Sequence, residues 1–289
     1  MTVSRRFRFV QFEFPWVLGP QPGRYTIRER LGEAPAYVLV LSTLGAPERR
    51  LLASRRRPRE AAPEPDPEPV PTSRATLVDT AALHDASGAE QWLREADGDA
   101  LADDAIARLN RVLHSHRAAA AEPFAREVAR EQALVTRIGF GDGESVADGN
   151  WESACELPAP TRGRGPHPER SALRAQERLA ALLTGRDAVL ACEELTLRAR
   201  SDVHAGRWRE AALQLRAAFE AALEELEPWS ERPSLPERLE QLRGRRDEVA
   251  AVAEAALRGG VDDDHVQTIR SVLERLEAVL RARSAGGFG

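Results

Sequence analysis

A proline-rich segment at residues 58–71 is the strongest constraint on how this chain can fold, because proline stands at every second position from Pro63 to Pro71. Proline lacks the backbone N–H group that helices and sheets need, and it drives the preceding residue towards extended geometry. Such a run favours polyproline II and acts as a semi-stiff spacer. We therefore expect a linker at residues 58–73. The alternative is a loop within one α+β domain, since strand patterns occur on both sides of it.

The two sides of this segment differ in charge. The chain has 289 residues and a formal net charge of −5, but residues 1–57 hold eleven arginines and four acidic residues, a net of +7, which leaves −12 for the rest. A basic head on an acidic body predicts either an electrostatic contact within the chain or an anionic partner for the head. All 41 basic residues are arginine, which is typical of GC-rich coding and lowers the weight of any one arginine cluster.

The cysteine content and the hydropathy of the sequence indicate in which cellular compartment the protein is expected. Cys155 and Cys192 form neither a CxxC pair nor a disulfide framework, which fits a reducing compartment. The basic N-terminus is followed by no apolar stretch of the signal-peptide kind, and no apolar run approaches the ~20 residues of a membrane-spanning helix. We expect a cytoplasmic protein without a membrane partner, and the residue pattern predicts no metal site and no cofactor.

Period-two alternation predicts strands in the N-terminal part. Aromatic and polar residues alternate from Phe7 to Trp16, and the phase changes at Val10 and Gln11, where we expect a β-bulge. Further strand patterns follow at residues 24–30, 36–44 and 74–80. Together they predict an antiparallel sheet, in which residues 1–57 form a small basic module.

The region at residues 74–157 is expected to be mostly helical and to complete an α+β domain. Helix signals occur at residues 87–98, 100–117, 123–136 and 144–157, and one strand-like stretch occurs at residues 133–140. Prolines and glycines at residues 158–168 predict a second linker.

The C-terminal region, residues 169–289, predicts an antiparallel helical bundle. Helices are expected at residues 169–184, 187–205, 207–227, 236–257 and 262–283. The last one has an apolar stripe at heptad spacing, formed by Val266, Ile269, Leu273, Leu276 and Leu280. Two interpretations are open. The stripe packs only on the preceding helix of the same chain, or it also forms part of a partner or oligomer surface. The fold class is therefore α+β: an N-terminal sheet, a proline-rich hinge and a mainly helical remainder.

One short segment resembles a known helical repeat. Residues 205–212, Ala-Gly-Arg-Trp-Arg-Glu-Ala-Ala, are similar to the helix–turn–helix junction of tetratricopeptide-like arrays. The segment occurs once, and any helical hairpin produces the same pattern.

A second resemblance concerns catalysis. Arg111 and His116 lie five residues apart on a predicted helix, a spacing that resembles the RxxxxH signature of HEPN-type ribonucleases, which are helical bundles. The resemblance implies that His116 acts as acid or base in phosphodiester cleavage and that Arg111 holds the phosphate.

Glycines and histidines provide two weaker patterns. Gly139, Gly141 and Gly143 could present backbone donors to a phosphate, but the spacing is neither that of a P-loop nor that of a dinucleotide site, so a glycine turn explains them better. His84, His114 and His116 could gather around a metal ion, but His114 and His116 are two residues apart and do not share a helix face, which favours surface histidines over metal ligands.

The arginines of the N-terminal part form a candidate surface for anions or nucleic acid. Its members are Arg6, Arg8, Arg55, Arg56 and Arg57, and the nearby aromatic residues would stack on bases. The opposing interpretation is a half-buried strand, whose aromatic residues face the core while the arginines are solvated.

These patterns favour a non-enzymatic, cytoplasmic interaction or adaptor protein that binds a protein partner, or a second copy of itself, through its C-terminal helices. The basic N-terminal module would contact a second partner. The alternative is a nucleic-acid-associated protein, including a HEPN-like nuclease. A third class is an enzyme whose active site is assembled from residues scattered along the chain. A single sequence does not reveal such a site, and no catalytic motif is recognisable in this one.

Overall fold

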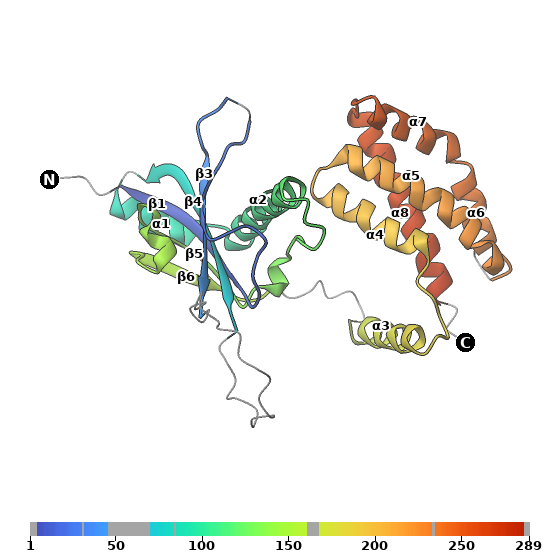
Figure 1. Ribbon diagram of the computed structural model, residues 1–289, viewed down its shortest axis with the longest axis horizontal. Helices are drawn as coiled ribbons and strands as arrows, with labels where there is room; N and C mark the ends of the chain where they lie inside the picture. The colour runs from blue at the N-terminus through green and yellow to red at the C-terminus, as the bar shows by residue number, and fades with distance from the viewer. Residues whose placement is uncertain are drawn as a thin grey trace, which may run out of the picture. The chain divides into compact units, whose positions relative to one another are not determined.

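The chain forms two compact units, Met1–Gly163 and Arg164–Gly289. The structure is a computed structural model, and it describes residues 5–30, 32–45, 70–83, 85–160, 168–232 and 235–285. The first unit contains a six-stranded sheet and the second is helical (Figure 1). The predicted α+β class, with an N-terminal antiparallel sheet and a mainly helical remainder, is confirmed.

The sheet of the first unit is antiparallel throughout, with strand order β2-β3-β4-β1-β5-β6. Its strands are β1 (Arg6–Phe14), β2 (Gly23–Ile27), β3 (Tyr37–Leu44), β4 (Thr72–Leu83), β5 (Val135–Asp142) and β6 (Ser153–Leu157). Leu44 at the end of β3 pairs with Thr72 at the start of β4. The proline-rich segment therefore connects two neighbouring strands of one sheet.

β1 carries aromatic side chains on both faces of this sheet. Phe12 belongs to the main core cluster, whereas Phe9 belongs to a second cluster on the opposite face. The bulge predicted at Val10 and Gln11 is wrong, because β1 pairs with β5 in unbroken register across both residues. The aromatic phase changes because both faces are covered, and the one register shift of β1 lies against β4, between Phe7 and Phe9.

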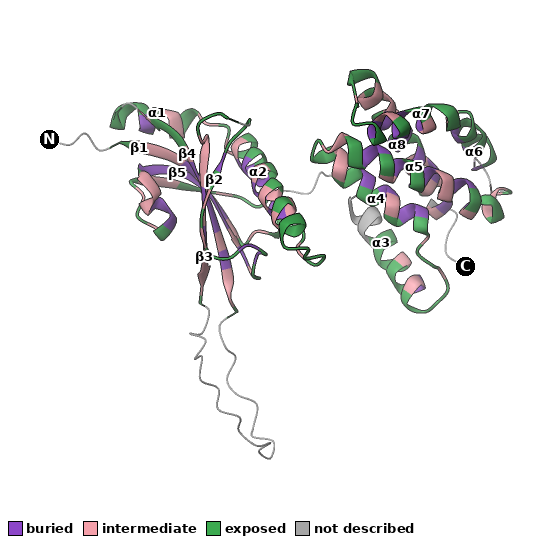
Figure 2. Cartoon of the chain, turned by 45° about the horizontal axis from the view of Figure 1, so that its top comes forward, coloured by how far each residue is buried: buried purple, intermediate pink, exposed green. Residues whose placement is uncertain are grey.

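Two helices follow β4 in the first unit. They are α1 (Ala86–Glu95) and α2 (Gly98–Ala119), and each begins at an aspartate whose carboxylate accepts a backbone hydrogen bond, Asp85 from Gly88 and Asp97 from Ala100. One stripe of α2 is buried against the sheet, as the purple residues of Figure 2 show. This stripe consists of Ala102, Ala105, Ile106, Leu109 and Leu113.

Two helices predicted in the middle region are wrong. Residues 123–136, all of which the structure describes, contain the short 3₁₀ helix Arg130–Gln132 and otherwise irregular chain up to β5. Residues 144–157 contain most of the 3₁₀ helix Gly143–Asp148 and then the edge strand β6. Gly149, at φ 93°, ends that 3₁₀ helix, and pairing with β5 extends the chain that follows. Sheet pairing is non-local and overrides local helix propensity.

The described part of the second unit has six α-helices and the short 3₁₀ helix Glu227–Trp229. The α-helices are α3 (Pro168–Leu183), α4 (Ala191–His204), α5 (Trp208–Glu225), α6 (Leu235–Arg243), α7 (Arg246–Leu257) and α8 (Asp263–Ala285). The single helix predicted at residues 236–257 is wrong, because the chain turns at Gly244 and Arg245 and so separates α6 from α7.

The segment similar to a tetratricopeptide-like junction lies between α4 and α5. Gly206 has φ 70°, a conformation that glycine adopts without steric cost. Three alanines allow the helices to approach closely, since Ala199, Ala211 and Ala218 have no exposed surface. α4 and α5 are therefore the central hairpin of this unit.

Candidate interaction groove of the helical unit

The heptad stripe of α8 is part of the core of its own bundle. Ile269 and Leu276 are completely buried, and Leu273 is almost so. Leu280 is partly buried against the same cluster, and Val266 is also only partly exposed. The expectation of a partner surface along this stripe requires correction for the three buried residues, because the neighbouring helices already cover them.

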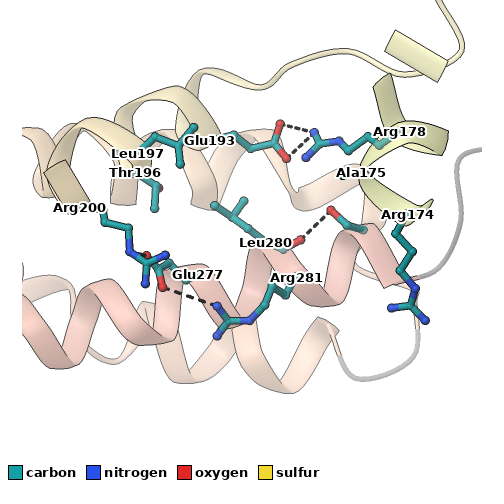
Figure 3. Close-up of a pocket in the computed structure, with 11 residues that line it drawn as sticks. Arg174, Ala175, Arg178, Glu193, Thr196, Leu197, Arg200, Glu277, Leu280 and Arg281 are labelled. Atoms are coloured by element: carbon teal, nitrogen blue, oxygen red, sulfur yellow. Dashed lines mark hydrogen bonds and ion pairs between the residues drawn. The ribbon is translucent and has the colours of Figure 1, made fainter. Parts of the chain in front are cut away.

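The surface of α8 around Leu280, the last residue of the stripe, remains open. Together with α3 and α4 it forms a groove with a cavity of about 490 Å³ (Figure 3). The residues that line it include Arg174 and Arg178 of α3, Leu197 and Arg200 of α4, and Glu277, Leu280 and Arg281 of α8. We call it the α3–α4–α8 groove.

Positive charge exceeds negative charge in this groove. Arg200 Nε lies 3.0 Å from one carboxylate oxygen of Glu277, and Arg281 Nη1 lies 3.6 Å from the other. Two guanidinium groups thus share one carboxylate, as Figure 3 shows for the Arg281 pair. Arg174 adds a third, exposed guanidinium. The two arginine side chains beside Glu277 are 63% and 68% exposed, so their charge is accessible to a ligand.

Apolar side chains accompany these arginines. Leu197 is 63% exposed on α4, next to the partly buried Leu280 of α8. On α3, Leu173, Leu179 and Leu183 are all more than half exposed. Among the α3 residues with described side chains, Ala181 alone is buried. α3 therefore leaves these three leucines largely uncovered.

A network of ion pairs ties α3 to the rest of the bundle. Arg178 Nη2 donates to both carboxylate oxygens of Glu193 at 2.6 Å, and its Nε donates to Asp187 at 3.2 Å. Arg283 of α8 donates to the same two carboxylates. Burial raises the pKa of the Asp187 carboxyl, but the Ala188 amide and the guanidinium of Arg283 outweigh burial and hold that pKa below its usual value. This network sets the position of one wall of the groove.

The residues that resemble a nuclease signature point to different neighbours. Arg111 Nη1 lies 3.3 Å from the carboxylate of Glu29, which also binds Arg108. His116 packs on Gly19, where an added Cβ would be 2.8 Å from the imidazole. The described contacts therefore give the pair no common phosphate-binding position.

The candidate anion-binding arginines of β1 are already paired with carboxylates. Arg6 Nε lies 2.5 Å from Glu152, and Arg8 lies 3.8 Å from Asp79 and over the ring of Trp92. The other three candidates, Arg55, Arg56 and Arg57, lie outside the described residues. In the described part of the chain, both β1 candidates therefore have carboxylate partners that compete with an anionic ligand.

The glycine cluster belongs to β5 and its end rather than to a phosphate-binding loop. A Cβ on Gly139 would lie 2.4 Å from the carbonyl oxygen of Ser153 and 2.9 Å from Phe9, so the close approach of β6 requires glycine. Gly141 has similarly little room, and Gly143 has φ 58° where β5 ends.

Three further features bear on function: possible metal ligands, possible membrane-spanning helices and the buried cysteine. No cluster of histidine, cysteine and carboxylate side chains suited to a metal ion occurs among the described residues, and His84 lies outside them. Within the same residues, no helix combines the length and the apolar character needed to cross a bilayer. Cys192 is buried, and burial together with the carboxylate of Glu225 raises the pKa of its thiol to about 12.

Apart from Leu280, the residues of the groove were not predicted from the sequence, although a local signal exists. Leu197 and Arg200 are three residues apart on α4, and Glu277 and Arg281 are four apart on α8, so each pair shares a helix face. Only the packing of α3, α4 and α8 brings these faces together. Comparison of the chain with protein-family models, with curated proteins and with solved structures found no match in any of the three.

Proposed function

We propose that this chain is a non-enzymatic cytoplasmic interaction protein, and that its helical unit binds an acidic, leucine-containing helical segment of a protein partner in the α3–α4–α8 groove. The observation that carries the proposal is the combination of Arg174, Arg200 and Arg281 with the exposed Leu197 around one cavity.

The chemistry of the groove favours such a segment. An amphipathic helix binds by laying its apolar side chains into a groove between helices. Leu197 and Leu280 offer apolar contact at the centre, and the exposed leucines of α3 extend it beyond the cavity. Acidic residues at the edges of the ligand would bind Arg174, Arg200 and Arg281, whose charge Glu277 only partly neutralises.

Selection from a displayed library of random peptides, with the full chain as bait, tests this proposal. We expect the recovered peptides to combine leucine or other apolar residues at helical spacing with glutamate or aspartate. Recovery should be lost with Arg200→Glu and Arg281→Glu, which reverse the charge of the groove. Arg258→Glu is the matched control, because Arg258 is an exposed arginine of this unit, just past the end of α7, that does not line the groove.

Two results would contradict the proposal. One is recovery of peptides without an acidic bias, and the other is equal recovery by the parent and by the groove variants. Circular dichroism of each variant shows whether the helical unit remains folded, which we expect because the substituted side chains are exposed.

A further inference from the structure

The N-terminal unit has a second groove, which is lined by exposed aromatic and apolar side chains. Trp16 is 37% exposed, Val17 60% and Phe124 79%, and they border a cavity of about 830 Å³ together with His116 and Arg126. Large apolar side chains gathered around one concave site mark a binding surface more often than isolated exposed ones do. We call it the Trp16–Phe124 groove.

Both walls of this groove are held by contacts with the sheet and with α2. On one wall the ring of Trp16 packs on Phe14 in a tilted arrangement at a centroid distance of 5.6 Å, and the amide of Leu18 donates to Ser73 Oγ at 3.0 Å. On the other wall Asn110 of α2 makes two hydrogen bonds of 2.8 Å with the backbone of Val128. The site is therefore preformed, which lowers the entropy cost of binding.

The side chains of this groove match one kind of ligand. Polyproline II segments bind in grooves lined by aromatic residues, since their own conformation is already ordered and their proline rings pack on aromatic faces. Trp16 and Phe124 supply aromatic faces, and His116 and Ala125 complete the lining near Gly19.

The chain itself contains a proline-rich sequence, and the described residues that directly follow it lie beside the groove. Proline alternates with other residues from Pro63 to Pro71, and β4 begins at Thr72. Phe14, two residues before Trp16, pairs with Ser73, whose hydroxyl binds the groove residue Leu18. In polyproline II geometry the seven residues 63–69 extend over about 20 Å, so they need no further spacer to lie along the groove.

The place where the segment ends, rather than charge, favours this occupant. The lining contains one arginine, Arg126, and two glutamates, Glu122 and Glu127, so its charge does not select the acidic residues that alternate with the prolines. We propose that the Trp16–Phe124 groove is a polyproline II binding site whose occupant is the segment 63–69 of the same chain.

A competition experiment with the full chain tests this proposal, and the probe is a fluorescent peptide of residues 60–71. A variant with Pro63, Pro65, Pro67 and Pro69 replaced by serine should bind the peptide, because its groove is vacated. The parent should bind it at least about tenfold more weakly, since a tethered segment competes at a high effective concentration. Adding Phe124→Ser to the serine variant should abolish binding, and Phe124 is exposed enough for the unit to fold without it.

Three outcomes would overturn the proposal. If the serine variant does not bind the peptide, the groove is not a polyproline site. If parent and serine variant bind equally, the tethered segment does not occupy the groove. If the parent binds the peptide as tightly as the serine variant does once the protein is diluted, the competing segment comes from a second copy and not from the same chain.

Discussion

The guanidinium of Arg283 lies 2.7 Å from the carboxylate of Asp187, and both side chains are more than nine-tenths buried. Arg283 stands near the C-terminus of α8 and Asp187 in the loop between α3 and α4. Glu193 and Arg178 complete a network of two positive and two negative charges. The network fixes α3 relative to α4 and α8, and it therefore shapes the groove to which we assign partner binding.

Arg283→Ala should destabilise the helical unit by about 3–5 kcal/mol, because removing one partner leaves buried carboxylates uncompensated. Urea unfolding followed by circular dichroism measures this change. Arg258→Ala is the matched control, since its pair with Glu254 is exposed and contributes at most about 1 kcal/mol. Equal unfolding midpoints for the two variants would mean that the network does not hold the bundle.

The stability of the helical unit should fall as the pH becomes acidic. The pKa values of Asp187 and Glu225 are lowered in the folded state, where backbone amides and Arg283 outweigh burial. A lowered folded-state pKa contributes stability above the unfolded-state value, 3.8 for aspartate, and this contribution is lost as the pH falls through the folded-state pKa. Urea midpoints over a pH series should show the loss, with a shallower slope for Asp187→Asn. An unchanged slope in that variant would exclude Asp187 as a source.

The two cysteines should react with a thiol reagent at very different rates. Cys155 is exposed in the edge strand β6, whereas the buried Cys192 has a thiol pKa raised to about 12 and so contains almost no thiolate at neutral pH. In the native protein we expect one fast thiol, which Cys155→Ser removes, and a second thiol that reacts only after denaturation. Two fast native thiols would show that the bundle opens around Cys192.

Gly139→Ala should destabilise the sheet by about 1–3 kcal/mol, because the added Cβ would meet the Ser153 carbonyl at 2.4 Å and force β6 outwards. Gly23→Ala in β2 is the control, since its nearest neighbour would be at 3.9 Å. Thermal unfolding of the two variants compares them directly. If both melt as the parent does, the close packing of β5 and β6 is not what requires glycine.

Local patterns predicted much of the secondary structure. The alternation at residues 74–80 corresponds to β4, and the breaks at Gly185 and Gly206 correspond to helix ends, both with positive φ. Such features depend on a few neighbouring residues, so one sequence is enough to recognise them. The helix predicted at residues 144–157 failed for the opposite reason, because pairing of β6 with β5 decides its conformation.

The candidate groove could not be predicted in the same way. The heptad stripe drew attention to Ile269, Leu273 and Leu276, which turned out to face the bundle core. The open surface of α8 shares only Leu280 with that stripe, and it becomes a groove only when α4, about eighty residues earlier, lies beside it. A single helix pattern shows which residues share a face but not which face remains uncovered.

The most direct test of the proposed function is the affinity of a selected acidic peptide for the parent and for three charge reversals, measured by fluorescence anisotropy. We expect Arg200→Glu and Arg281→Glu each to weaken binding at least about tenfold, because a repulsive charge replaces an attractive one. Arg258→Glu should bind as the parent does, and added salt should weaken the parent complex. Equal affinity of all four proteins, without dependence on salt, would contradict partner binding in the α3–α4–α8 groove.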